Sequence, residues 1–237
     1  MNELVARTYD RRRFFGPIGR YVDKQEKKIV KELVLSVEEA ATVLDIPCGT
    51  GRFFEVLRAT GRMLVGADVS KSMLSVAGQR FSSYLEQERP SLVVCVIEHL
   101  PFRDEVFRCV TSVRLHGHLP PAAKKLAIDE MNRVSNGFIV LSFYNLLSVM
   151  GILDKVTSII SNRPNESFPE TPSSIKRNFW ARGAKVKSFR AILPFISVTS
   201  FVLAEKTRRP VDADPKSVLG TSMRDPKTTE QITAKLK

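Results

Sequence analysis

Short apolar runs alternate with helix-length amphipathic segments along most of this 237-residue chain. The runs have the length and the continuous apolar character of strands that are buried on both faces. They lie at residues 42–46, 63–67, 92–96, 108–114, 137–143, 185–190 and 199–205. This alternation predicts an α/β fold whose core is a doubly wound, seven-stranded, mostly parallel sheet.

The ends of the chain depart from this alternation. Residues 1–40 are predicted to form one or two basic helices that cap the active site, with a break at Arg11 to Pro17. Residues 41–206 are predicted to form the α/β domain. From residue 207 to 237 the chain is polar and rich in proline, which predicts a disordered tail.

One uncharged window, residues 136–153, reaches the lower length limit for a bilayer-spanning helix. It contains several polar side chains, including Asn145 and Tyr144, so we interpret it as a buried strand followed by an apolar helix near residues 146–160. Residues 1–28 mix acidic and basic side chains without a continuous apolar run, so no signal peptide is expected.

Candidate chemistry begins where the first strand ends. The run from Val43 to Ile46 carries Asp45 and is followed by a turn with Gly49 and Gly51. Glycine tolerates positive φ and lets a ligand approach the bare backbone where the next helix begins. Gly-x-Gly alone is a weak signal, because any tight strand-to-helix turn could use it.

The second strand strengthens this interpretation. It ends in Asp68, about 20 positions after the glycines, where a carboxylate at the strand tip can accept both hydroxyls of a ribose. A simpler role for Asp68 is to cap the helix that starts near Ser70, and the two roles are compatible.

With these motifs the sequence resembles the class I S-adenosylmethionine-dependent methyltransferases, especially the small-molecule branch of quinone- and sterol-type enzymes. The resemblance extends over roughly residues 5–205 and implies a Rossmann-like fold, in which the last two apolar runs form the antiparallel hairpin that closes the sheet. The residues that carry it are Tyr9-Asp10, Val43 to Gly51, Val65 to Ser70, Glu98 to Phe102, Phe107 to Leu119 and Glu130 to Val134.

The resemblance implies the cofactor S-adenosyl-L-methionine and a set of residues around it. Asp45 would hold the ammonium group, the glycine turn would face the methionine part, and Asp68 would hold the ribose. The implied cofactor-binding residues are Asp45, Pro47, Cys48, Gly49, Thr50, Gly51, Asp68, Val69, Ile97 and Glu98. The family commonly has an aspartate near the adenine where this chain has Val96, so the adenine contact is where the sequence departs from the pattern.

Two histidines after the fourth strand are candidates for a general base. His116 and His118 follow the end of the fourth strand, where a methyl acceptor would bind, and a histidine titrates near neutral pH. Alternatively, these side chains line the pocket or bond to the backbone. Tyr9 and Tyr144 are candidate substrate contacts.

The cysteines do not suggest metal binding or covalent catalysis. Cys48, Cys95 and Cys109 lie in or beside apolar runs without metal-ligand spacing, which favours reduced core thiols and a reducing compartment, the cytoplasm. No metal site is expected.

The net charge of +12, from 37 basic and 25 acidic residues, indicates an anionic partner or only a solvated basic face. Aromatic and aliphatic residues among the N-terminal arginines are compatible with peripheral contact to a membrane. The end of the fourth strand lacks the Asn/Asp-Pro-Pro-Tyr/Phe signature of base-amino methyltransferases, so nucleic acid is not the favoured substrate. The sequence does not determine an oligomeric state.

We therefore expect a methyltransferase that acts on a small, hydrophobic or lipid-like acceptor. Two alternatives remain open. One is a nucleic-acid- or protein-binding module that keeps the fold with little or no turnover, and the other is an RNA or protein methyltransferase.

Overall fold

The computed structural model of the chain describes residues 3–37, 42–60, 63–83, 89–160 and 167–207. All of them belong to one compact unit, Met1–Thr207. The tail predicted for residues 207–237 lies, apart from Thr207, outside the described residues.

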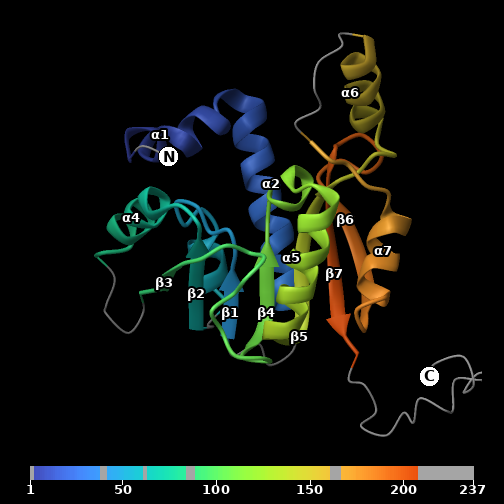
Figure 1. Cartoon of the computed structure of the whole chain (residues 1–237). Coiled ribbons are helices and arrows are strands. Elements are labelled where there is room, and N and C mark those ends of the chain that lie inside the picture. The colour runs from blue at the N-terminus through green and yellow to red at the C-terminus, as the bar shows by residue number, and fades with distance from the viewer. Residues whose placement is uncertain (1–2, 38–41, 61–62, 84–88, 161–166, 208–237) are drawn as a thin grey trace, which may run out of the picture. The chain divides into compact units, whose positions relative to one another are not determined.

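The core of this unit is a seven-stranded sheet with the order β3-β2-β1-β4-β5-β7-β6 (Figure 1). The first five strands in this order are parallel, and β7 is antiparallel to both β5 and β6. The strands are β1 Thr42–Asp45, β2 Met63–Asp68, β3 Ser91–Val94, β4 Phe107–Ser112, β5 Ser135–Tyr144, β6 Ala184–Ala191 and β7 Thr199–Lys206. The predicted sheet and its closing hairpin are confirmed.

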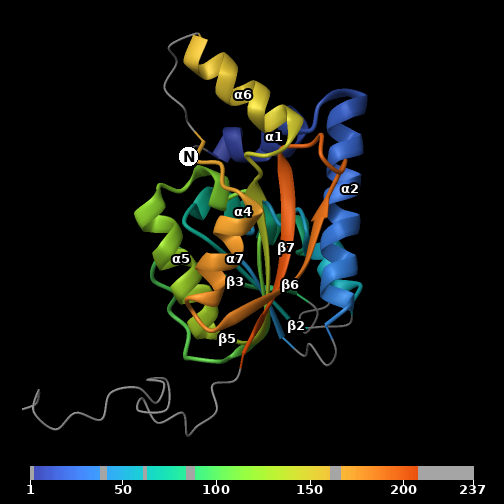
Figure 2. The same cartoon turned by 90° about the vertical axis from the view of Figure 1, so that its right-hand side faces the viewer.

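Helices cover both faces of the sheet. Figure 2 views the sheet on edge, with α5 and α7 on one side and α2 on the other. The helices are α1 Glu3–Arg13, α2 Gly16–Leu35, α3 Phe54–Arg58, α4 Lys71–Arg80, α5 Pro121–Val134, α6 Val149–Ile160 and α7 Pro172–Trp180, with a 3-10 turn, η2, at His116–His118. The strand and helix predicted within residues 136–153 correspond to β5 and the start of α6.

Alternating side chains on the central strands explain this sandwich. In β1, Val43 packs into a cluster with α2, α3 and α4, whereas its neighbour Leu44 packs into a second cluster with α5 and α7. Successive strand residues point to opposite faces, so both must be apolar when helices cover both faces. The continuous apolar runs of the sequence follow from this geometry.

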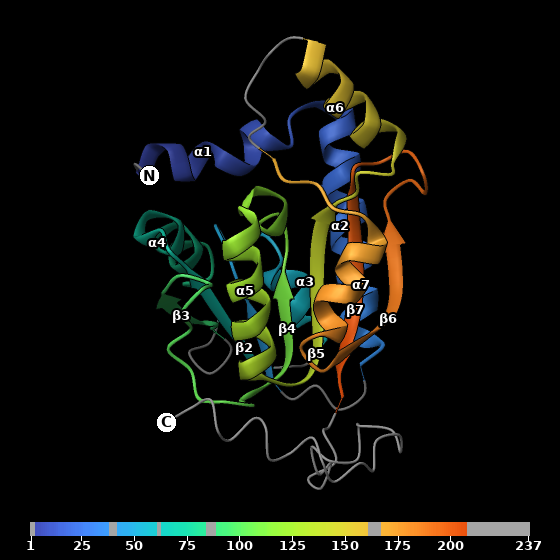
Figure 3. The same ribbon diagram turned by 45° about the vertical axis from the view of Figure 1, so that its right-hand side comes forward.

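Two helices, α1 and α6, lie beyond the carboxyl ends of the parallel strands rather than on a sheet face (Figure 3). Within the described ranges, no helix is both long enough and apolar enough to span a bilayer.

Candidate functional site

The turn that links β1 to α3 is held between the two strands beside β1. Ile46 N donates to Thr111 O on β4 at 2.9 Å, and Cys48 N donates to Ala67 O on β2 at 2.8 Å. Gly49 and Gly51 have φ values of 56° and 75°, the left-handed region that glycine adopts without strain. A Cβ on Gly49 would meet no atom within 4 Å, so this part of the turn exposes its backbone to open space.

Asp68, at the end of β2, is bonded to this turn. Gly49 N donates to Asp68 Oδ2 at 2.9 Å, and Ser70 N donates to Asp68 Oδ1 at 2.8 Å. The N-cap residue of α4 is Ser70, whose Oγ accepts from Met73 N. Each carboxylate oxygen offers about two acceptor sites, so both Asp68 oxygens keep a lone pair that a ligand hydroxyl could use.

Asp45 is completely buried at the end of β1. Its Oδ1 accepts from Thr111 Oγ1 at 2.8 Å, while its Oδ2 has no hydrogen-bond partner among the described residues. Burial raises the pKa of Asp45 to about 7, although the hydrogen bond from Thr111 and the charge of Arg52 lower it. A buried carboxylate with an unpartnered oxygen fits a cationic ligand group such as an ammonium.

A cavity of about 270 Å³ lies against the glycine turn, the ends of β2 and β4, and α1. Several predicted site residues line it: Tyr9, Pro47, Cys48, Gly49, Thr50, Asp68 and Val69. Asp45 and Gly51 are not among its described lining residues. The structure therefore brings the ribose and methionine-side candidates together around one space.

Cys48 lines this cavity but is poorly suited to act as a nucleophile. It is buried, and burial together with the charges of Asp45 and Asp68 raises the pKa of its thiol. Cys109 is also buried and Cys95 half-buried, and all three are free thiols. In the described part of the chain no group of His, Cys, Asp and Glu side chains could hold a metal ion.

Helix α1 is fastened over the glycine turn and α4. Thr50 Oγ1 donates to Asp10 Oδ2 at 2.6 Å, and Arg7 Nη2 donates to Gln79 Oε1 at 2.7 Å. The guanidinium of Arg80 lies 3.7 Å from Asp10. These contacts support the predicted cap, and they show why the Tyr9-Asp10 pair lies next to the turn.

A buried charge network that the sequence analysis missed joins α2 to the site. Glu26 is fully buried on α2 and pairs with Arg52 at 2.8 Å and with Arg114 at 2.7 Å. Arg52 also pairs with Asp23 at 2.7 Å. The ring of Phe14 lies near both guanidinium groups, with 4.4 Å from its centroid to Arg52 and 5.3 Å to Arg114. Both arginines line the cavity.

A sequence signal for this network existed. Glu26 stands at helical spacing with Ile29, Val30 and Leu33, on the stripe of α2 that is buried. A charged residue on an apolar stripe requires a buried partner.

The turn predicted to flank the adenine follows β3. Ile97 is buried and Glu98 half-buried, and neither is among the described lining residues of the cavity. Cys95 N donates to Asp68 O at 3.2 Å, so this turn begins beside the Asp68 strand tip. Val96 is 41% exposed and brings no acceptor side chain.

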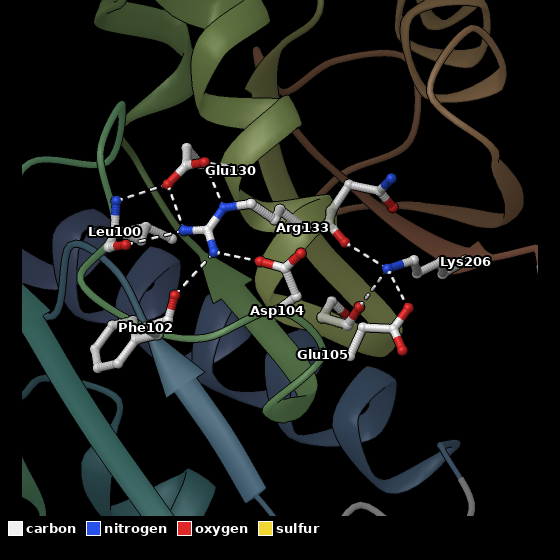
Figure 4. A network of polar contacts seen from close by, with 9 residues as sticks. Leu100, Phe102, Asp104, Glu105, Glu130, Arg133 and Lys206 are labelled. Carbon is white, nitrogen blue, oxygen red and sulfur yellow. Dashed lines mark hydrogen bonds and ion pairs between the residues drawn. The ribbon is translucent and has the colours of Figure 1, made fainter.

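Helix α5 braces the chain that follows this turn (Figure 4). Leu100 N donates to Glu130 Oε2 at 2.7 Å, and Arg133 donates to Leu100 O at 2.9 Å and to Phe102 O at 2.8 Å. Arg133 also pairs with Asp104 at 2.7 Å. The contacts explain why the segments Glu98 to Phe102 and Glu130 to Val134 appear together in the sequence pattern.

The two candidate histidines have different surroundings. His116 is buried, and its Nε2 lies 2.7 Å from Oε2 of Glu170, which also binds Lys124 at 3.0 Å. Burial lowers the pKa of His116, against the opposing effect of Glu170. His118 is exposed, and its Nε2 lies 2.9 Å from the hydroxyl of half-buried Tyr144. Neither histidine, nor Tyr144, is among the described residues that line the 270 Å³ cavity.

Comparison with known proteins finds similarity to methyltransferases. Residues 43–136 match the family model of a methyltransferase domain. Methyltransferase GfsG of Streptomyces halstedii is 32% identical over 127 residues, 53% of this chain and 45% of GfsG. The chain thus spans about half the length of GfsG. Demethylmenaquinone methyltransferase of Clavibacter sepedonicus is 25% identical over 204 residues, 78% of this chain and 80% of that protein.

The fold is also that of a solved methyltransferase. The crystal structure of magnesium protoporphyrin IX methyltransferase from Synechocystis PCC 6803 with bound SAH has a TM-score of 0.69 and 14% identity, over 86% of this chain and 99% of that chain. The segment that matches the family model contains the glycine turn and Asp68, which line part of the cavity. Residues 43–136 therefore match a methyltransferase domain, and the chain is similar in fold to a solved methyltransferase.

Proposed function

We propose that the protein transfers a methyl group from S-adenosylmethionine to a small, hydrophobic or lipid-like acceptor. The observation that carries the proposal is a set of candidate ligand-binding groups at adjoining strand ends, of which the glycine turn and Asp68 line one cavity. An exposed glycine-turn backbone, the Asp68 carboxylate and the unpartnered oxygen of Asp45 lie at adjoining strand ends. Ligands of open α/β sheets bind beyond the carboxyl ends of the strands.

Each of these groups has a proposed role. The backbone at Gly49 faces the methionine part of the cofactor, and Asp45 attracts its ammonium group. Asp68 accepts hydrogen bonds from the ribose hydroxyls with the lone pairs that Gly49 and Ser70 leave free. Ile97 and Glu98 flank the adenine.

The cofactor supplies a methyl group on a sulfonium, which an acceptor atom displaces in line. The protein contributes mainly proximity and alignment, which can lower such barriers by about 7–11 kcal/mol. Helix α1, through Tyr9 and Arg13 in the cavity wall, would keep water away from the reacting atoms.

For an acceptor that must lose a proton, His118 is the better base candidate. It is exposed, and its contact with the Tyr144 hydroxyl orients the ring toward the end of β5. His116 is 1% exposed and hydrogen-bonded to Glu170, so its proposed role is only to hold the η2 turn in place.

A small apolar acceptor is supported by the wall of the cavity and by the relatives. Phe14, Met73 and Val113 line the cavity. The relative from Clavibacter sepedonicus is named a demethylmenaquinone methyltransferase, and the relative from Haemophilus ducreyi is named a ubiquinone/menaquinone biosynthesis C-methyltransferase. Methylation of RNA or protein remains the second candidate, because the net charge is +12.

Calorimetric titration with S-adenosylhomocysteine tests the cofactor site. We expect wild type to bind and Asp68→Ala to bind at least about tenfold more weakly, since hydrogen bonds to a charged group are lost. Asp129→Ala is the matched control, because Asp129 is an exposed carboxylate on α5 whose ion pair with Arg182 is remote from the cavity. Absence of binding by folded wild type would refute the proposal.

Transfer of a labelled methyl group identifies the acceptor class. Purified protein and labelled S-adenosylmethionine are incubated with the lipid, RNA and protein fractions of a cell extract. Label in the lipid fraction supports the proposal, and label only in RNA or protein would favour the second candidate.

A further inference from the structure

Helix α6 presents an apolar face to solvent. Val149, Met150, Ile152, Leu153 and Val156 recur at helical spacing, and each is 45–51% exposed. Figures 1, 2 and 3 all show the helix standing beyond the carboxyl ends of the parallel strands. Single exposed apolar residues are ordinary, but a contiguous group of this size marks an interaction surface.

The connection between β6 and β7 extends this face. Phe195 is 86% exposed and Ile196 50% exposed. Val149 N donates to Phe195 O at 2.8 Å, and Met150 N donates to Ile196 O at 3.2 Å. The start of α6 and the tip of this connection are therefore one continuous surface.

The corner between α1 and α2 lies on the same edge of the sheet (Figure 3). Its Phe15 and Ile18 are 83% and 81% exposed. Its charged residues are basic and exposed: Arg11, Arg12, Arg13 and Arg20. The following acid, Asp23, is paired with Arg52 and Lys27. We call α6, residues 193–196 and residues 11–20 together the rim.

We propose that the rim docks onto an anionic membrane surface. Apolar side chains of an interfacial segment insert at the boundary between headgroups and acyl chains, while nearby arginines attract anionic headgroups. The rim combines both features. A purely apolar partner would leave the arginines of the corner without counterions.

This proposal deepens, and rests on, the proposed lipid-like acceptor. Arg13 and Phe14 belong to the rim and also line the 270 Å³ cavity. A lipid-soluble acceptor would thus reach the cavity from the bilayer edge without crossing water.

Vesicle sedimentation tests the docking without cofactor or acceptor, so its outcome is independent of methyl transfer. We expect binding to vesicles of phosphatidylcholine with phosphatidylglycerol, and at least about tenfold weaker binding to phosphatidylcholine alone. The partition coefficient of the double variant Met150→Ser/Leu153→Ser onto the anionic vesicles should be lower than that of wild type by about tenfold or more. Met63→Ser is the matched control, because Met63 is 70% exposed at the start of β2, the opposite end of the strands.

Tryptophan fluorescence provides a second measurement that does not depend on a destabilising variant. The chain has one tryptophan, Trp180, exposed at the end of α7. In a Trp180→Phe background, the emission of a tryptophan introduced by Phe195→Trp should shift to the blue when anionic vesicles are added. The emission of Trp180 in wild type should not shift.

Three results of the vesicle experiments would overturn the proposal. They are equal binding of wild type and the double variant, equal binding to neutral and anionic vesicles, and an unshifted Phe195→Trp emission. A stable dimer that Met150→Ser/Leu153→Ser dissociates would also overturn it, by assigning the face to a second copy of the chain. Failure of cofactor binding with intact vesicle binding would instead refute the proposed function alone.

Discussion

Asp45 has one bonded and one unpartnered carboxylate oxygen, and its pKa is raised from 3.8 to about 7, chiefly by burial. The folded state therefore holds this proton more tightly than the unfolded state. The resulting stabilisation is complete below about pH 4 and is lost as pH rises through about 7.

Asp45→Asn stays neutral at every pH, so it isolates this effect. We expect the unfolding free energy of wild type, relative to the variant, to fall between about pH 4 and pH 7 and to level off above about pH 7. Denaturant unfolding of both proteins across this range measures the difference. Parallel pH profiles would show that Asp45 is ionised throughout.

Glu170 shows the opposite behaviour. Burial alone would raise its pKa, but hydrogen bonds from His116, Lys124 and Ser174 outweigh this effect and lower the pKa to about 2. The stabilisation is therefore present above about pH 4.5 and is lost as pH falls toward 2.

Glu170→Ala would leave Lys124, which is 5% exposed, without its carboxylate partner. We expect a loss of about 3–5 kcal/mol, which corresponds to a melting temperature lower by about 6–20 °C. Glu205→Ala serves as the comparison, because its partner Lys187 is exposed and such pairs contribute about 0–1 kcal/mol. Equal melting temperatures for the two variants would contradict the role assigned to Glu170.

Among the elements, α5 holds the chain that follows the turn proposed to flank the adenine, through Glu130 and Arg133. Arg133→Ala would free the carbonyls of Leu100 and Phe102, so the turn should become looser and S-adenosylhomocysteine should bind several-fold more weakly. Lys206→Ala is the control, since Lys206 bonds Asn132 O and Ser135 O without touching the turn (Figure 4). Calorimetry and melting together separate the effects: both variants should lose stability, and only Arg133→Ala should lose affinity.

The positions of the elements could be predicted because their signals are local. A strand buried on both faces must be a continuous apolar run, so β1, β4 and β5 are found close to their observed limits. Edge strand β3 is different. It was expected at residues 92–96 but ends at Val94, because its residues are partly exposed and the apolar pattern does not define where the turn starts.

The candidate site could be predicted only where its residues have a recognisable spacing along the chain. The glycine turn and Asp68 have a characteristic spacing. The partners of Glu170 do not, because His116 and Lys124 come from η2 and α5, and no local pattern reports which distant side chains meet. The contact between Asp10 and Thr50 depends likewise on how α1 crosses the turn.

At the scale of the whole molecule, the two N-terminal helices are attached in different ways. Helix α2 buries Ile29, Val30, Leu33 and Val34 in the same cluster as β1 and α3. Burial of four such side chains contributes about 6–12 kcal/mol, comparable with the total stability of a domain. Helix α1 buries only Ala6 among its described apolar side chains and holds the turn by polar contacts.

Two truncations should therefore behave differently. A variant lacking residues 1–14 keeps α2 and should melt cooperatively, but it should bind S-adenosylhomocysteine more weakly, since Tyr9, Asp10 and Arg13 leave the cavity wall. A variant lacking residues 1–37 should not fold, because the hydrophobic cluster that contains Val43 of β1 would lose the apolar side chains of α2 and be exposed to water. Circular dichroism melting and calorimetry measure both. Cooperative melting of the variant that lacks residues 1–37 would mean that residues 1–40 are a separable cap. Unchanged affinity of the variant that lacks residues 1–14 for S-adenosylhomocysteine would mean that α1 does not enclose the cofactor.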